Sequence, residues 1–197
     1  MSPEEISVSE RPAEDDPTTG EALDPEAEDD PTSDVGLTGA SSFDTAHFKE
    51  VLGHFTSGIT VITGADREGP VGFTCQSFMS LSLEPPLVAF GPSLTSSSWP
   101  RIQAVGAFCV NVLGEHQEAL SRVFATKDPD KFRGVGWRRA ATGSPVLDQV
   151  LAWIDCRIDT VHQAGDHLLV VGRVQELGVG EGEPLLFYRA GYGRFES

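Results

Sequence analysis

The sequence predicts a mainly β protein, an antiparallel barrel with two or three short helices. Six or seven runs of β-branched and aromatic residues recur between residues 59 and 195, separated by turns rich in Gly, Asp and Pro. Most neighbouring runs are joined by short turns, which is typical of hairpins, whereas a parallel sheet needs a helical crossover between strands. The 197 residues are enough for one domain with a sizeable core.

The first forty residues differ in composition from the rest of the chain. Residues 1–40 contain thirteen Asp and Glu, one Arg and five prolines. They carry −12 of the net charge of −16, so the remaining residues are only mildly acidic. Such a segment buries too little apolar surface to offset its ordering entropy. We therefore predict a disordered acidic tail at 1–40 and a folded domain at 41–197; a docking peptide is the alternative for the tail.

The folded part is expected to begin with an amphipathic helix followed by a hairpin. Ser42 is a candidate cap and Gly58 a candidate end for this helix. Its apolar positions follow the i, i+3, i+4, i+7 pattern and are Phe48, Val51, Leu52 and Phe55. The β-branched run 59–64 and the run 70–77 then predict two strands around a turn.

Hydroxyl residues are concentrated in the next two segments. Thr74, Ser77, Ser80 and Ser82 alternate with apolar residues in a strand that stops at Pro85 and Pro86, before a strand at 87–91. By itself this pattern fits a solvent-exposed strand face as well as a strand against which a flat ligand lies. Several serines in 93–98 then precede a short helix with Pro100 in its first turn. Spare backbone N–H groups and hydroxyls at a helix start suit a phosphate group.

The remaining elements alternate strands with one helix and one long loop. In order, we expect a buried strand at 107–113, a helix at 115–125 with Leu120, Val123 and Phe124 inward, a polar loop at 127–137 anchored by Phe132 and Trp137, a hairpin of 150–162 with 167–174, and a last strand at 184–195. On the first hairpin strand, Ile154 and Cys156 share one face, and Trp153, Asp155 and Arg157 share the other.

Composition excludes several classes of partner and location. A nucleic-acid partner requires a basic patch, and the chain has only short basic clusters interrupted by acids. A membrane helix requires about eighteen consecutive apolar residues, which the sequence lacks. The N-terminus has no signal peptide pattern, and Cys75, Cys109 and Cys156 are scattered as free thiols would be. We therefore expect a cytoplasmic protein without a membrane or nucleic-acid partner.

The candidate chemistry is that of a cofactor enzyme. The five histidines show no metal-ligand spacing on one element, so no metal is expected, and no nucleophile elbow, P-loop or Rossmann fingerprint occurs. A Ser-His-Asp hydrolase stays open, although no motif indicates one. What remains is a strand of hydroxyls, a serine turn, the loop 127–137 and the Gly-Asp-His turn at 165–167. Such a set suits a cofactor that performs the chemistry while the protein positions it.

These motifs resemble the flavin reductase family with the FMN-binding split barrel, the reductase components of two-component flavin-dependent monooxygenases. The resemblance spans residues 43 to about 195. It is carried, in the family's order, by G-F-T-C-Q-S-F-M-S-L-S-L-E-P-P-L-V, F-C-V-N-V-L, K-F-x-G-V-x-W, G-S-P-V-L, A-W-I-D-C-R, A-G-D-H and P-L-L-F-Y-R. Gln76 and Ser57 depart from the usual residues at their positions, although both keep hydrogen-bonding capacity.

The resemblance implies a homodimer that binds FMN or FAD near the subunit interface and uses NADH or NADPH as electron donor. It implies flavin-binding roles for Ser57, Thr74, Cys75, Gln76, Ser77, Ser80, Ser82, Ser96, Ser97, Ser98, Lys131, Phe132 and Tyr192. Phe195 falls in the same C-terminal region. His167 and Asp166 match the Gly-Asp-His motif, where the histidine lies near the nicotinamide.

The implied reaction is hydride transfer from NAD(P)H to flavin N5, with backbone N–H groups of 75–77 stabilising the reduced ring. Reduced flavin would then pass to a partner monooxygenase. The alternatives are a flavin-binding module without turnover, a related split-barrel oxidase acting on a B6-type substrate, and a non-enzymatic scaffold for a partner of the tail.

Overall fold

The protein was analysed as a computed structural model that describes residues 44–195. The tail predicted at 1–40 and the cap predicted at Ser42 lie outside these residues. In chain order the elements are α1 (Thr45–Leu52), β1 (Ser57–Gly58), β2 (Thr60–Asp66), β3 (Gly69–Cys75), β4 (Met79–Leu83), β5 (Pro86–Phe90), α2 (Trp99–Val105), β6 (Ala107–Val112), the 3-10 helix η1 (Glu115–Gln117), α3 (Glu118–Phe124), β7 (Trp137–Arg139), β8 (Pro145–Leu147), β9 (Ala152–Ala164), β10 (His167–Val179), β11 (Leu185–Tyr188) and β12 (Gly191–Arg194). Among the helices described, none has the length and apolarity needed to cross a bilayer.

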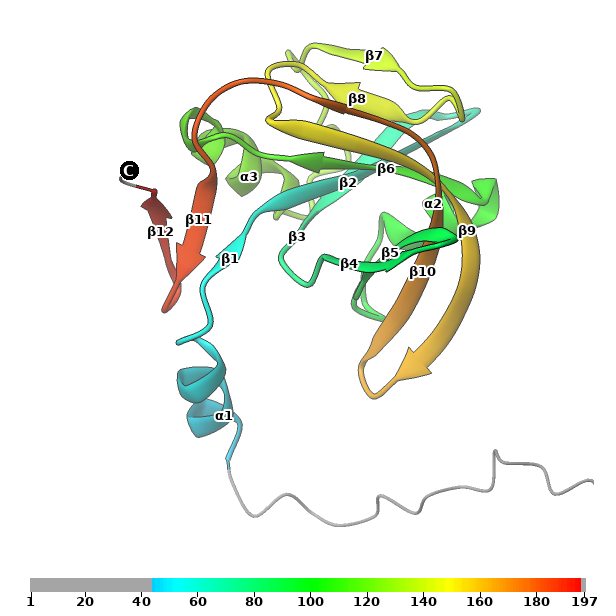
Figure 1. Ribbon diagram of the computed structural model, residues 1–197. Helices are drawn as coiled ribbons and strands as arrows, with labels where there is room; N and C mark the ends of the chain where they lie inside the picture. The colour runs from blue at the N-terminus through cyan, green and yellow to red at the C-terminus, as the bar shows by residue number, and fades with distance from the viewer. Residues whose placement is uncertain (1–43, 196–197) are drawn as a thin grey trace, which may run out of the picture. The chain divides into compact units, whose positions relative to one another are not determined.

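A seven-stranded antiparallel sheet forms the body of the domain. Its strand order is β3-β2-β6-β9-β10-β5-β4, and the long β9–β10 hairpin curves along one side of it (Figure 1). Two small sheets, β1-β11-β12 and β7-β8, complete the fold. Every strand pairing is antiparallel and the helices are short, so the prediction of a mainly β, split-barrel fold is confirmed.

Strands β2 and β6 have a hydrophobic core on each face. Ile62 and Phe108 belong to one core cluster, which α2 helps to close through Trp99 and Ile102. The alternate residues, such as Val61, face a second cluster that includes Phe124 of α3 and residues of β8. The uninterrupted apolar runs of these two strands are explained by burial on both sides.

Helix α1 differs from its prediction at both ends and in its packing. The Asp44 side chain caps it by accepting a 2.7 Å hydrogen bond from the His47 N–H, and the helix ends at Leu52. It does not continue to Gly58 because that residue pairs in β1 with Leu186 of β11. The apolar side chains predicted for the helix face are exposed: Phe48 is 47 %, Val51 53 % and Leu52 54 % accessible, and Phe55, which follows the helix, is 82 % accessible.

Other sequence-based expectations were wrong for local reasons. Val123 of α3 is exposed, while Ser121 on the same helix is buried because it makes two contacts described below. The predicted last strand is a hairpin, β11–β12, that turns at Arg189 and Ala190 with positive φ. Asp155, which shares a strand face with Trp153 and Arg157, is fully buried and accepts hydrogen bonds from the Thr142 backbone N–H at 2.8 Å and the Thr142 hydroxyl at 2.6 Å.

Candidate functional site

A cavity of about 530 Å³, here called the β3 cavity, opens where strand β3 ends. It brings together segments that lie far apart in the sequence: Phe73, Thr74, Cys75, Gln76, Ser77, Gly91, Pro92, Ser93, Ser96, Ala125, His167, Phe187 and Tyr192. Seven of the residues predicted from the sequence are among them, namely Thr74, Cys75, Gln76, Ser77, Ser96, His167 and Tyr192. The sheet therefore gathers the hydroxyl strand, the serine turn and the Gly-Asp-His turn around one space.

The end of β3 is fixed by side-chain hydrogen bonds to the backbone. The Thr74 hydroxyl donates to the Ser121 carbonyl at 2.7 Å. The Ser77 hydroxyl accepts a 2.9 Å hydrogen bond from the Gly91 N–H and lies 3.2 Å from the Gly91 carbonyl. A Cβ atom at Gly91 would lie 3.1 Å from the Ser77 Oγ, so glycine permits this close approach. The segment 74–77 is thus held in place before any ligand binds.

Cys75 lines the β3 cavity as a neutral thiol. Burial raises the pKa of Cys75, and the Ser77 hydroxyl, 3.3 Å from the thiol sulfur, offsets this only in part. A thiol that stays protonated is a poor nucleophile. Cys75 therefore contributes shape and backbone to the site, and a Cys75→Ala change should have a mild effect.

His167 is held at the rim of the β3 cavity by its neighbour in the sequence. Its Nδ1 lies 2.8 Å from the Asp166 carboxylate, and this hydrogen bond is the main cause of a lowered pKa of Asp166. An ionised carboxylate only accepts, so the His167 Nδ1 carries the proton and its Nε2 is left for a ligand. The turn itself is tied to the serine segment, because the Leu94 N–H donates to the Asp166 carbonyl at 3.0 Å.

Tyr192 also lines the β3 cavity. Its hydroxyl lies 3.0 Å from the Ser121 Oγ, and its ring packs edge-on against Phe187 with centroids 5.3 Å apart. The Arg122 guanidinium lies 4.6 Å from the Tyr192 ring centroid. Helix α3 therefore determines where the C-terminal hairpin meets the cavity.

The three serines of the predicted phosphate turn have different environments. Ser96 lines the β3 cavity, and its hydroxyl accepts a 3.2 Å hydrogen bond from the Trp99 N–H. Ser98 is buried and donates to the Gly72 carbonyl at 2.9 Å. Ser97 lines a smaller cavity of about 190 Å³, here called the serine cavity.

The serine cavity gathers cations. Its lining includes Pro70, Val71, Gly72, Ser97, Ser98, Arg101, Lys127, Asp128, Pro129, Lys131 and Phe132. The Lys131 ammonium is buried and donates to the carbonyls of Gly72 and Phe124, each at 3.1 Å. Burial lowers the pKa of Lys131. Arg101 and Lys127 were not predicted as site residues. Their positions could have indicated them, because Arg101 follows the serine turn and Lys127 begins the K-D-P-D-K run.

The other predicted residues lie outside these two cavities. Ser57 lines a separate cavity beside α1. Ser80 and Ser82 lie on the edge strand β4, and the exposed Phe195 follows β12. Within residues 44–195, no group of three or more His, Cys, Asp and Glu side chains is placed to hold a metal ion.

The residues of the β3 cavity fit a flavin. A flat, hydrogen-bonding ring system needs apolar faces and polar groups along its edge, and the cavity offers Phe73, Phe187 and Tyr192 together with hydroxyl, amide and imidazole groups. The adjoining serine cavity offers the cations and hydroxyls that a phosphate needs.

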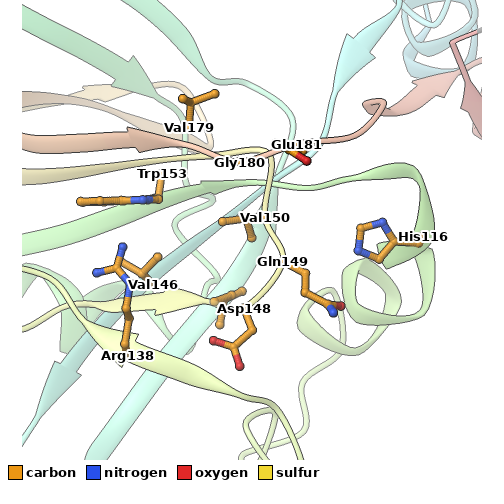
Figure 2. A pocket seen from close by; sticks show the side chains of 11 residues that line it. His116, Arg138, Val146, Asp148, Gln149, Val150, Trp153, Val179, Gly180 and Glu181 are labelled. Atoms are coloured by element: carbon orange, nitrogen blue, oxygen red, sulfur yellow. The ribbon is translucent and has the colours of Figure 1, made fainter.

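A further cavity of about 550 Å³ lies at the other small sheet, between β7, β8, β9 and the end of β10. Figure 2 shows Arg138 beside Trp153, with His116 on the opposite side. The Arg138 guanidinium lies 4.5 Å from the Trp153 ring centroid. This cavity contains none of the sequence-predicted site residues and shares no lining residue with the β3 cavity.

Comparisons with known proteins agree with this fold and site. The family described as the flavin reductase like domain matches residues 52–196. The chain is 50 % identical over 158 residues to the reductase subunit HsaB of a flavin-dependent monooxygenase from Rhodococcus jostii, covering 80 % of this chain and 81 % of the relative. A flavin reductase from Pseudomonas putida is 48 % identical over 157 residues, covering 79 % and 92 %. The crystal structure of nitrilotriacetate monooxygenase component B from Mycobacterium thermoresistibile superposes with a TM-score of 0.75 at 48 % identity, covering 77 % of this chain and 86 % of that one.

The chain therefore belongs to the flavin reductase-like family of split-barrel proteins. It is an NAD(P)H-dependent flavin reductase that supplies reduced flavin to a monooxygenase.

Proposed function

We propose that the isoalloxazine ring of the flavin lies in the β3 cavity, along residues 74–77. The observation that carries this proposal is the meeting of the strand end, His167 and Tyr192 around one cavity of about 530 Å³. The hydrogen bonds of Thr74 and Ser77 already hold residues 74–77 in place, so the protein loses little conformational entropy when a ring binds. The bound flavin supplies the two-electron chemistry, because it accepts electrons from the nicotinamide and releases them elsewhere.

The flavin phosphate lies in the serine cavity. Lys131 supports this placement because a buried ammonium with only carbonyl partners is stabilised by a nearby anion. Ser97 and Lys127 are the groups at the mouth of the cavity that can contact such an anion directly. Ser98 has a different role, since its hydroxyl already donates to the Gly72 carbonyl and holds the turn against β3.

His167 orients the nicotinamide ring. Its Nδ1 is engaged by Asp166, so the ring plane is fixed and Nε2 is left for the ligand. Asp166 is a positioning residue that acts through the imidazole. The hydrogen bond from His167 lowers the pKa of Asp166, so the carboxylate is ionised and accepts from Nδ1.

The working unit is a cytoplasmic homodimer that passes reduced flavin to its monooxygenase by diffusion. The edge strand β4 supports the dimer: Met79, Leu81 and Leu83 are exposed on an unpaired edge of the main sheet, a surface that proteins usually cover. Three buried free cysteines support a reducing compartment.

An anaerobic reduction assay tests the proposal. Under anaerobic conditions, purified protein with excess FMN and either NADH or NADPH is expected to reduce the FMN over many turnovers, so that the absorbance of oxidised flavin disappears. Flavin that stays oxidised with both donors would contradict a reductase and favour a binding module. Light scattering across a dilution series tests the dimer, and a monomer at working concentrations would contradict it.

A further inference from the structure

We propose that the cavity at the small sheet β7-β8 binds an organic monocarboxylate with an apolar body. This cavity, here called the β7 cavity, has a volume of about 550 Å³ and is lined by Arg138, Val150, Trp153 and the residues around them. Its size is that of a small-molecule pocket. It shares no lining residue with the β3 cavity or with the serine cavity, so its ligand is a further one, beyond the flavin.

Arg138 is the group that would bind the carboxylate. Its guanidinium lies 4.5 Å from the Trp153 ring centroid, so stacking on the indole orients it. The indole in turn lies against Gly178, where a Cβ atom would come within 2.5 Å of the Trp153 Nε1. Within residues 44–195, Arg138 forms no ion pair, whereas Arg122 and Arg173 each pair with a carboxylate. An oriented guanidinium without a partner can bind one carboxylate through two parallel hydrogen bonds.

The floor of the β7 cavity is apolar. Val146, Leu147 and Val150 are buried beneath it and belong to the second core cluster. Val179, at the end of β10, is 88 % exposed and lines the same cavity. An apolar ligand body would therefore rest on a fixed hydrophobic surface and cover a valine that is otherwise in water.

Gln149 lies between the two ends of the cavity in an unusual conformation. Its φ is 60°, a left-handed value that is unfavourable for a residue with a side chain and is often found at ligand clamps. The flanking backbone is held by hydrogen bonds, since the Asp148 N–H donates to the Gly136 carbonyl at 3.0 Å and the Leu151 N–H donates to the Val112 carbonyl at 2.9 Å. Among the described residues the Gln149 carboxamide has no hydrogen-bond partner, so it is available to a ligand.

The charges around the β7 cavity select the class of anion. Asp148 and Glu181 line the cavity together with the single guanidinium of Arg138. Two carboxylates would repel a phosphate dianion, whereas one carboxylate can be matched by one guanidinium. Figure 2 shows Arg138 and His116 at opposite ends of the cavity. The structure therefore favours a monocarboxylate whose far end carries a hydrogen-bond donor, such as a hydroxyl group, and disfavours nucleotides.

A titration with 6-hydroxy-2-naphthoate tests this assignment. The compound has a flat apolar body with a carboxylate at one end and a hydroxyl at the other. Protein labelled with fluorotryptophan should give three fluorine NMR signals, from Trp99, Trp137 and Trp153, and Trp153→Phe identifies the signal from the cavity. Saturating FMN is present throughout, so that the probe is kept out of the β3 cavity. We expect the Trp153 signal to shift with a Kd below about 1 mM, and the signal of the buried Trp99 to stay in place.

Two neighbouring arginines provide a matched pair of variants. Arg138→Gln should raise the Kd for the naphthoate by at least about tenfold, because its charge-assisted hydrogen bonds are lost. Arg139→Gln is the control: the Arg139 guanidinium also lies near an indole, 5.7 Å from the Trp137 ring centroid, but it does not line the β7 cavity. This second change should leave the Kd nearly unchanged. On the wild-type protein, the neutral amide of the probe should bind at least about tenfold more weakly, and inorganic phosphate should not shift the Trp153 signal.

Several outcomes would overturn the inference. They are a Trp153 signal that does not move at about 10 mM probe, an equal loss in the two arginine variants, and an amide or phosphate that binds as well as the naphthoate. A Trp153 signal that moves when the protein is diluted without probe would show that a second copy of the chain fills the cavity instead. None of these readouts requires turnover, so a failure to reduce FMN would count against the proposed function and leave this inference standing.

Discussion

The Ser121 Oγ lies 3.0 Å from the Tyr192 hydroxyl, so α3 holds the C-terminal hairpin at the β3 cavity. The carbonyl of the same Ser121 accepts the Thr74 hydroxyl at 2.7 Å. One fully buried serine therefore positions both Thr74 and Tyr192, which line the β3 cavity. In the proposed site their placement determines how tightly the flavin ring is held, which makes Ser121 a positioning residue.

Replacing Tyr192 by Phe should both lower stability and weaken flavin binding. The change leaves the buried Ser121 hydroxyl without its partner, at a cost of about 1–3 kcal/mol, and frees the wall to shift. We expect the KM for FMN to rise about threefold to tenfold with kcat nearly unchanged, as measured by steady-state kinetics. Tyr188→Phe is the matched control on the neighbouring strand, since the Tyr188 hydroxyl contacts His54 instead. Equal effects of the two changes would count against a positioning role for Tyr192.

Replacing His167 by Ala should raise the KM for NAD(P)H while leaving the Kd for FMN nearly unchanged. Asp166→Asn should reproduce part of this effect, because a neutral amide no longer fixes the tautomer of the imidazole. His162→Ala, an exposed histidine on the same hairpin, provides the control. Unchanged donor kinetics in His167→Ala would reduce this residue to part of the turn.

Replacing Ser97 by Ala and Lys127 by Gln should raise the Kd for FMN about tenfold and the Kd for riboflavin much less, because only FMN carries a phosphate. Both side chains line the serine cavity without a structural hydrogen bond among the contacts of the described residues. Ser98→Ala should instead lower the Tm, since its hydroxyl supports the Gly72 carbonyl. Fluorescence titration gives the two Kd values. A loss of the same size for riboflavin would place the phosphate elsewhere.

The ion pair between Asp66 and Arg101 should make stability depend on pH in the acid range. The Arg101 guanidinium donates two hydrogen bonds to the carboxylate, at 2.6 and 2.8 Å, and lowers the pKa of Asp66 from 3.8 to about 2. A lowered folded-state pKa stabilises the fold above the unfolded value, and this contribution is lost as the pH falls through about 2. Thermal melts should show Asp66→Asn less stable than wild type near neutral pH, with the gap narrowing from pH 3.8 to about 2. A gap that stays constant over this range would contradict the assignment.

Deleting residues 1–40 should leave flavin reduction intact. All the residues that line the β3 cavity lie beyond the acidic segment 1–40, which is predicted to be a disordered tail. The comparison is kcat/KM for NADH and FMN in the full and shortened chains, followed by aggregation at high concentration. Lost reduction, with an unchanged melt, would show that the tail takes part in the reaction or in binding.

Local pattern was sufficient for much of this fold. The β-branched runs around Ile62 and the hairpin that turns at Gly165 lie where their residue types predict, because strand periodicity and turn chemistry act over a few residues. The turn at Arg189 and Ala190 carried no such signal, so the β11–β12 hairpin was taken for one strand. The strands β7 and β8 were missed for a related reason: they are three residues each and depend on the core beneath them.

The sequence by itself determined the class of fold, the hydroxyl shelf and the Gly-Asp-His turn, since each is encoded in contiguous residues. Only the tertiary structure decided how these meet. It separated the serine turn, with Ser96 in one cavity, Ser97 in another and Ser98 in the packing of β3. It also brought Lys49 near Arg189, 140 positions later, at a single cavity. Such pairings arise from strand order and hydrogen bonds between distant segments, and no local propensity specifies them.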